Sequence, residues 1–183
     1  MTSGPQGGDR RAAVWIAALL FCFYLLTTSG REHYGDESRY LTIAENLILF
    51  GEPKATVHFD TDDGQRRARS GYVWYPLGQS LLLLPFVAAD LTARGSLLVL
   101  PSFVSTMIVN ALPAAESAGM CALLFLLLRL SGEAAVALRL SRRTAAFVAV
   151  ATGLATQMWP SASTLYADNS AAFLVALALW SLV

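Results

Sequence analysis

The stretch that decides the fold is Ala12-Ala13-Val14-Trp15-Ile16-Ala17-Ala18-Leu19-Leu20-Phe21-Cys22-Phe23-Tyr24-Leu25-Leu26-Thr27-Thr28, which runs for 17 residues without a charged side chain. A helix of this length reaches roughly 26 Å, close to the ~30 Å hydrocarbon core of a bilayer. A cleaved signal peptide is the competing interpretation. However, the run exceeds the usual apolar region of about 7–15 residues, and no A-x-A cleavage site follows it. We therefore predict an uncleaved first span over 12–28, after a cytoplasmic tail over 1–11.

The composition of the whole chain agrees with a membrane location. Its 183 residues are 55% hydrophobic and 14% charged, whereas soluble domains carry about 25% charged residues. The 13 basic and 13 acidic side chains cancel, so no net field attracts nucleic acid as a partner. Cys22 and Cys121 lie in apolar runs, which argues against a disulfide, and His33 and His58 are too few and too far apart for a zinc motif.

Four further apolar runs follow, over 76–93, 104–128, 144–160 and 166–183. Arginines dominate 129–143, so by the positive-inside rule that loop is cytoplasmic, as are Arg10 and Arg11. Because the first span leaves the cytoplasm and the arginines of 129–143 are again cytoplasmic, only one span can return between them. The run over 104–128 is the longer candidate, whereas Pro85 breaks the run over 76–93.

These arguments predict an all-α, multispan transmembrane protein of the bacterial plasma membrane, with its amino terminus in the cytoplasm. We expect spans over 12–28, 104–128, 144–160 and 166–183, with an outer loop over 29–103 that contains 76–93 as a re-entrant or juxtamembrane helix. The last run stops at Val183 without a flanking charge, so we expect the amino-terminal part of a longer protein, incomplete and inactive as an enzyme on its own.

The outer loop concentrates the charge of the chain. Residues 29–70 hold 14 of its 26 charged side chains. Apolar positions at helical spacing predict an amphipathic juxtamembrane helix over 37–50, with Asp36 at its N-cap and Gly51 just past its end. An N-cap stabilises a helix by about 1 kcal/mol and needs no chemistry. Beside Glu37, however, Asp36 can also act as a general base with an orienting partner.

Arginines form the second group of candidate residues, and each has a structural interpretation and a functional one. Arg39, Arg66, Arg67 and Arg69 are either a solvated loop face or contacts for a phosphate, which the planar guanidinium binds in bidentate fashion.

Glu116 lies midway along 104–128, where ionisable side chains are rare and often functional. If the span begins later, however, Glu116 lies in its outer third and is exposed to water.

The order of these elements resembles a known family. Tyr34-Gly35-Asp36-Glu37-Ser38-Arg39-Tyr40-Leu41 follows the first span, and Tyr75-Pro76-Leu77-Gly78-Gln79-Ser80-Leu81-Leu82 follows the amphipathic helix. In this order the chain resembles the start of a GT-C glycosyltransferase, of the branch that includes protein O-mannosyltransferases and lipid A aminoarabinose transferases. The segment 158–172 resembles the second outer loop of such proteins, in which an acidic residue opens the fourth span.

The resemblance implies an enzyme that moves a sugar from a polyprenyl-phosphate carrier to a lipid, protein or polysaccharide acceptor at the outer face of the membrane. It implies that Asp36 is catalytic with Glu37 beside it, and that Asp168 is the second-loop acid. Many relatives have Glu followed by Pro or Met where this chain has Asp168-Asn169. The residues imply no cofactor, and a role for a divalent metal stays open.

The alternative is a noncatalytic multispan membrane protein, such as a transporter, a lipid-binding protein or an accessory subunit. Such a protein would also carry polar loops and an intramembrane Glu116. It does not predict a long first outer loop with paired acids at its opening, which favours the transferase.

Overall fold

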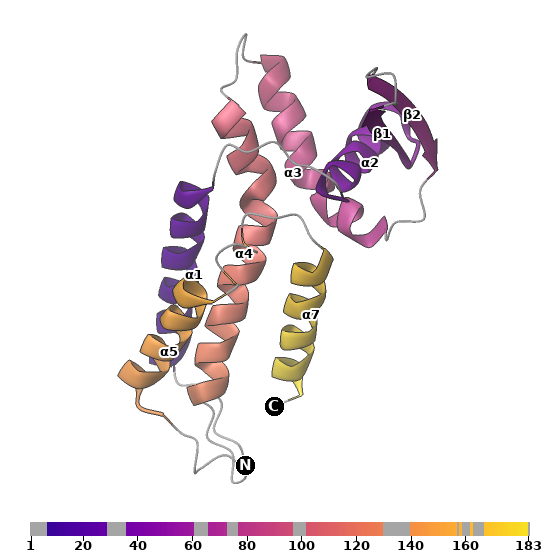
Figure 1. The fold of residues 1–183 in the computed structure, drawn as a ribbon. Coiled ribbons are helices and arrows are strands. Elements are labelled where there is room, and N and C mark those ends of the chain that lie inside the picture. Colours follow the sequence, from indigo (N-terminus) through magenta and orange to yellow (C-terminus); the bar gives the residue numbers. More distant parts are fainter. Residues whose placement is uncertain are drawn as a thin grey trace. The chain divides into compact units, whose positions relative to one another are not determined.

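The computed structural model describes residues 7–28, 36–60, 66–72, 77–96, 102–129, 140–156, 158, 162 and 167–182, drawn as ribbons in Figure 1. Helices dominate this part of the chain: α1 (Gly7–Thr27), α2 (Asp36–Phe50), α3 (Leu77–Ser96), α4 (Ser102–Arg129), α5 (Arg142–Ala155) and α7 (Ala167–Ser181). Strands β1 (Lys54–Asp60) and β2 (Arg66–Tyr72) form an antiparallel hairpin. The side chains of 36–37, 56–60, 66–70, 72, 96, 102–103 and 167 lie outside the description.

Two of the described helices are long and apolar enough to cross a membrane. They are α1, with 21 residues, and the part of α4 from Val104 to Arg129, with 26. Large apolar side chains on α1 face outward, with Trp15 76% exposed and Leu26 73% exposed. Isolated exposed apolar residues are ordinary on a soluble protein, but a row of them along one long helix fits contact with lipid.

The chain divides into two compact units, which are described separately. The first unit comprises residues 1–28, 113–163 and 168–183. Its core joins α1, the later part of α4 and α5 through small and large apolar side chains: Ala13, Ile16, Leu20, Tyr24, Ala114, Ala118, Cys121, Phe125, Ala145, Ala149 and Ala162. The alanines allow the helix backbones to approach closely, as in membrane helix packing. The Tyr24 hydroxyl donates a hydrogen bond of 2.9 Å to the Gly153 carbonyl and links α1 to α5.

The second unit comprises residues 29–112 and 164–167. In its core Tyr40 and Ala44 of α2 pack against Leu83 and Val87 of α3, together with Val109. The hairpin pairs Lys54 with Tyr72 at its open end and Asp60 with Arg66 at the end next to the turn.

The end of α2 fixes where the hairpin begins. Gly51 has φ +69°, and its amide donates to the Leu47 carbonyl at 3.1 Å, which is an αL cap that suits glycine. The Asn46 side chain then donates to the Lys54 carbonyl at 2.6 Å and holds β1 beside α2. The helix predicted over 37–50 and its glycine stop are therefore confirmed.

The predicted fold class and two of the predicted helices need correction. The hairpin is a departure from the all-α class, although the fold is mostly helical. Helix α1 begins at Gly7, so residues 7–11 of the predicted cytoplasmic tail are helical, and 1–6 lie outside the described residues. Helix α3 continues through Pro85, which is exposed, because Leu83 and Val87 stay packed on the opposite face and offset the cost of the lost hydrogen bond.

Helix α5 also ends earlier than predicted, at Ala155 instead of residue 160. Thr156 adopts an extended conformation, and its hydroxyl accepts a hydrogen bond of 3.2 Å from the Met158 amide. This side chain replaces the next helical backbone bond and ends the helix. With 14 and 15 residues, α5 and α7 reach about 21–23 Å.

Candidate functional site

The predicted acid pair lies at the start of α2, the first helix of the second unit. Helix α2 begins at Asp36, so Asp36 and Glu37 both occupy its first turn. Carboxylates are favoured there by the positive end of the helix dipole, whether or not they have a chemical role. Their side chains lie outside the described residues, and their position along the backbone is what the structure provides.

Three of the four predicted arginines share one strand. In the register of the hairpin, Arg66 lies opposite Asp60, Arg67 opposite Phe59 and Arg69 opposite Val57. The side chains of these strand residues lie outside the description. Arg39 is half-buried on α2, in the same unit.

Asp168 falls in the other unit. It lies in the first turn of α7 and is exposed. The structure therefore brings Asp36, Glu37 and the arginines into the second unit and places Asp168 in the first.

A polar cluster that was not predicted joins α2, α3 and α4 within the second unit. Asp90 is buried, with 1% of its surface exposed, and its Oδ2 pairs with the Arg94 guanidinium at 2.5 Å. The same guanidinium donates to the Ser105 hydroxyl at 2.7 Å. The other carboxylate oxygen of Asp90, Oδ1, is buried and has no hydrogen-bond partner among the described residues. Such an orphan oxygen is costly unless a ligand or water satisfies it.

Glu45 of α2 belongs to this cluster electrostatically. Burial raises the pKa of its carboxyl, the positive charge of Arg94 lowers it, and the negative charge of Asp90 raises it further. Two acids beside one guanidinium therefore share a partly desolvated site, an arrangement typical of functional sites and also of structural ion pairs.

Within the first unit, α4 carries a second buried acid. Glu116 is 6% exposed, and its Oε1 accepts a hydrogen bond of 2.6 Å from the Ser170 hydroxyl of α7. The buried Glu116 Oε2 and Ser117 Oγ have no hydrogen-bond partner among the described residues. The carboxyl therefore lies inside the protein, packed between α4 and α7.

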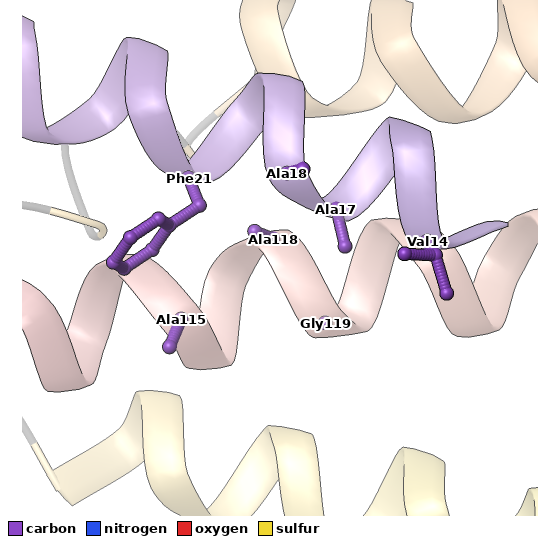
Figure 2. Close-up of a pocket in the computed structure, with 7 residues that line it drawn as sticks. All are labelled: Val14, Ala17, Ala18, Phe21, Ala115, Ala118 and Gly119. Atoms are coloured by element: carbon purple, nitrogen blue, oxygen red, sulfur yellow. The ribbon is translucent and has the colours of Figure 1, made fainter.

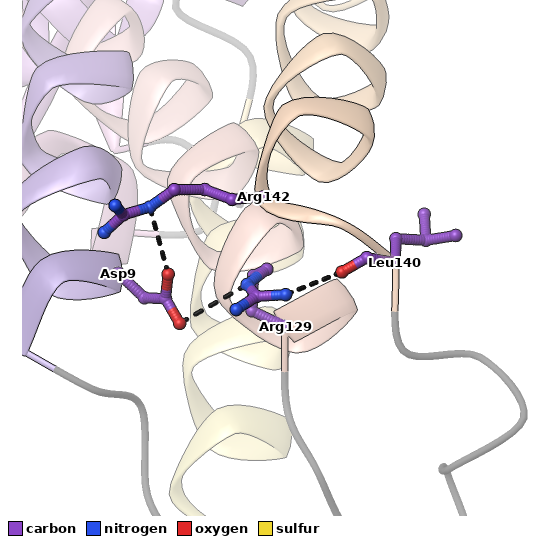
Figure 3. Close-up of polar contacts among 4 residues, drawn as sticks. All are labelled: Asp9, Arg129, Leu140 and Arg142. Carbon is purple, nitrogen blue, oxygen red and sulfur yellow. Dashed lines mark hydrogen bonds and ion pairs between the residues drawn. The ribbon is translucent and has the colours of Figure 1, made fainter.

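An ion-pair network closes one end of the first unit. Figure 3 shows the Asp9 carboxylate between two guanidiniums, with Oδ2 3.3 Å from Arg129 Nε and Oδ1 3.2 Å from Arg142 Nε. Arg129 also donates to the Leu140 carbonyl at 2.7 Å. Asp9 is 5% exposed. The network joins the first turn of α1 to the last turn of α4 and the start of α5.

An apolar groove lies between α1 and α4 in the first unit. Its volume is about 400 Å³, within the range of small-ligand sites. Figure 2 shows Val14, Ala17 and Phe21 of α1 facing Ala118 and Gly119 of α4 across it. With small and apolar side chains on both walls, the groove suits a hydrocarbon chain and offers no catalytic group.

Sequence analysis missed Glu45, Asp90 and Arg94, although a signal was present. Asp90 and Arg94 are four residues apart, the spacing of a helical ion pair. Asp90 also continues the buried face formed by Leu83 and Val87, and a polar residue on an apolar face is more informative than one on a polar face.

No arrangement of three or more His, Cys, Asp or Glu side chains suited to a metal ion occurs in the described part of the chain. Comparisons of this protein with protein-family models, with curated proteins and with solved structures found no match.

Proposed function

We propose that this protein is a membrane-embedded glycosyltransferase that moves a sugar from a polyprenyl-phosphate carrier to an acceptor at the outer face of the membrane. The observation that carries the proposal is the position of Asp36 and Glu37, which open α2 with eight residues (28–35) between them and the end of α1. A carboxylate pair directly after a membrane-length helix meets its substrate at the membrane surface, where a lipid-linked sugar is presented.

Further features of the described residues support this proposal. The first unit contains α1 and the longer part of α4, the two helices of membrane-crossing length, and an apolar groove between them. The second unit gathers α2, the arginine-bearing strand β2, and the Asp90–Arg94 pair. Taken separately, the groove of the first unit can hold an apolar chain, and the arginines of the second unit can bind a phosphate. The resemblance of 34–41 and 75–82 to GT-C transferases points to the same class.

The chemistry can be written for these residues. The acceptor hydroxyl attacks the anomeric carbon while the bond from this carbon to the phosphate oxygen breaks, and the electron pair leaves with the polyprenyl phosphate. Asp36 takes the proton of the acceptor, with Glu37 as its orienting partner. Arg39, Arg66, Arg67 and Arg69 neutralise the departing phosphate. Direct attack inverts the anomeric configuration.

The proposed membrane placement follows from the same features. In this placement α1 and α4, the two described helices of membrane-crossing length, are the first two spans. The shorter α5 and α7, which reach about 21–23 Å, are the third and fourth. Arg10, Arg11 and Arg142 mark the cytoplasmic side. The acid pair then lies on the outer side of a bacterial plasma membrane.

The experiment uses the protein expressed from its complete native gene in native membranes, supplied with polyprenyl phosphates that carry radiolabelled mannose, glucose or aminoarabinose. We expect loss of labelled carrier with one donor, and a decrease of at least about a hundredfold for Asp36→Asn, the usual size of a general-base contribution. Glu52→Gln is the matched control, because Glu52 is an exposed acid of the same unit. Equal rates for wild type and Asp36→Asn, or no turnover of any donor, would contradict the proposal.

A noncatalytic membrane function is the second candidate, and one observation favours it. Buried ionisable groups in membrane helices mark ion or solute pathways. Glu116 is buried in α4, and one of its carboxylate oxygens has no hydrogen-bond partner among the described residues. In that case Glu116→Gln abolishes solute uptake into proteoliposomes, whereas Asp36→Asn has no effect on it. The opposite pattern supports the transferase.

A further inference from the structure

The amino-terminal ends of α1 and α5 lie together in the first unit. Asp9 near the start of α1 pairs with Arg142 at the start of α5, and Tyr24 near the end of α1 bonds to Gly153 near the end of α5. These two contacts show that the helices run in the same direction, side by side, as Figure 1 also shows. The positive ends of two helix dipoles therefore meet at one end of the unit.

Exposed arginines surround this end. Arg10, Arg11, Arg142 and Arg143 are all exposed, and we call these four residues the arginine end. Asp9 is already engaged by Arg129 and Arg142. Among the described residues no carboxylate pairs with Arg10, Arg11 or Arg143. Three of the four guanidiniums of the arginine end therefore have no carboxylate partner in the described part of the chain.

The same arrangement of arginine and aromatic side chains occurs on both helices. Trp15, 76% exposed, follows Arg11 by four residues on α1, and Phe147, 73% exposed, follows Arg143 by four residues on α5. On each helix the aromatic residue thus lies one turn further along the same face as the arginine. The arginines form a charged cluster, and the exposed aromatic residues lie one helical turn further along. This order matches the boundary between the headgroups and the acyl chains of a bilayer.

We infer that the arginine end binds the headgroups of anionic phospholipids, with Trp15 and Phe147 against the adjoining acyl chains. Guanidiniums bind phosphate oxygens in bidentate fashion. A soluble anion has no use for the exposed aromatic side chains, so their position favours a lipid. The inference shares the membrane placement of α1 but does not depend on any transferase activity.

The test measures binding of phosphatidylglycerol and phosphatidylcholine to the purified full chain in detergent, by native mass spectrometry without any sugar donor. Each basic side chain near a membrane surface strengthens anionic-lipid binding about fivefold. We therefore expect Arg11→Gln/Arg143→Gln to lower the preference for phosphatidylglycerol by roughly twenty-five-fold. Arg11→Lys/Arg143→Lys keeps the charge and most of the preference, and 1 M salt weakens the preference in the wild type.

Lys54→Gln is the control for position, because it removes a positive charge from the second unit. It should leave the preference unchanged. Equal binding of the two lipids by wild type, or an unchanged preference in the glutamine variant, overturns the inference. Displacement of phosphatidylglycerol by inorganic phosphate at equal concentration also overturns it, because the site would then recognise a free anion.

Discussion

Glu45 shows how the second unit combines charge with burial. Its carboxyl is partly buried beside Arg94 and Asp90, and burial is the largest cause of its raised pKa. Between the ordinary value of 4.5 and the raised value, the folded protein holds a proton that the unfolded chain has lost. The free energy of unfolding therefore falls as the pH rises through this window, and the loss is complete above the raised pKa.

The first prediction is that Glu45→Gln stabilises the protein at neutral pH and leaves its stability unchanged near pH 3.5. The amide keeps the shape of the side chain but is never charged, so the variant escapes the loss that wild type suffers above the raised pKa. The measurement is the midpoint of thermal unfolding at the two pH values in one detergent. Glu52→Gln is the control, because Glu52 is exposed and its surface pair with Lys54 contributes little. A gain for Glu45→Gln that is equal at both pH values would show that the charge of Glu45 is not its cause.

At individual positions, the sequence predicted where acids stand but not which of them are buried. The place of Asp36 at the start of a helix follows from local spacing alone, although the helix includes Asp36 instead of beginning after it as an N-cap would require. The burial of Asp90 depends on α2 packing over α3, two helices separated in the sequence by the hairpin. Glu116 shows the same limit, since its partner Ser170 lies 54 residues away.

Helix packing in the first unit depends on a glycine in α5. A Cβ at Gly153 would lie 2.8 Å from the Tyr24 hydroxyl and 2.9 Å from Leu20 Cδ1, and both side chains are at most 1% exposed. Both side chains belong to the core of the first unit. The close approach of α1 and α5 therefore requires glycine at this position.

The second prediction compares two substitutions of the same kind in different helices. We expect Gly153→Ala to destabilise the protein by about 2 kcal/mol through overpacking. Gly78→Ala in α3 meets no atom within 4 Å, so it should be neutral or stabilise the protein by up to about 1 kcal/mol through helix propensity. Thermal unfolding of both variants in the same detergent measures the difference. A neutral Gly153→Ala would contradict the close packing of α1 on α5.

The helices were more predictable than the hairpin because each one is marked by a long run of regularly spaced apolar residues within a single segment. Apolar spacing predicted α2, α3 and α4 to within a few residues of their observed ends. Strand β1 also carries a pattern, with Ala55, Val57 and Phe59 alternating with polar residues. The many charges around it indicated a solvated loop instead. Strand β2, Arg66–Tyr72, has no such alternation and is defined by its pairing with β1, which a sequence pattern does not encode.

Both proposals depend on the side of the membrane on which each segment of the chain lies. Helix α1 has 21 residues and reaches about 31 Å, enough for one crossing. Its arginines at positions 10 and 11 favour a cytoplasmic start, so the chain after residue 28 should emerge on the outer side. A cleaved signal peptide would give the same outer side but would remove α1 from the mature protein.

The third prediction separates these cases with single cysteines in a variant whose Cys22 and Cys121 are replaced by alanine. Glu52→Cys, an exposed position of the second unit, should react in intact cells with a maleimide that does not cross membranes. Gly7→Cys, an exposed position at the start of α1 with no atom within 4 Å of an added Cβ, should react only after the cells are permeabilised. Reaction of both in intact cells would mean that α1 does not cross the membrane. Absence of the Gly7→Cys label from the full-length band after permeabilisation would mean that α1 is cleaved, and the arginine end could then not form beside α5.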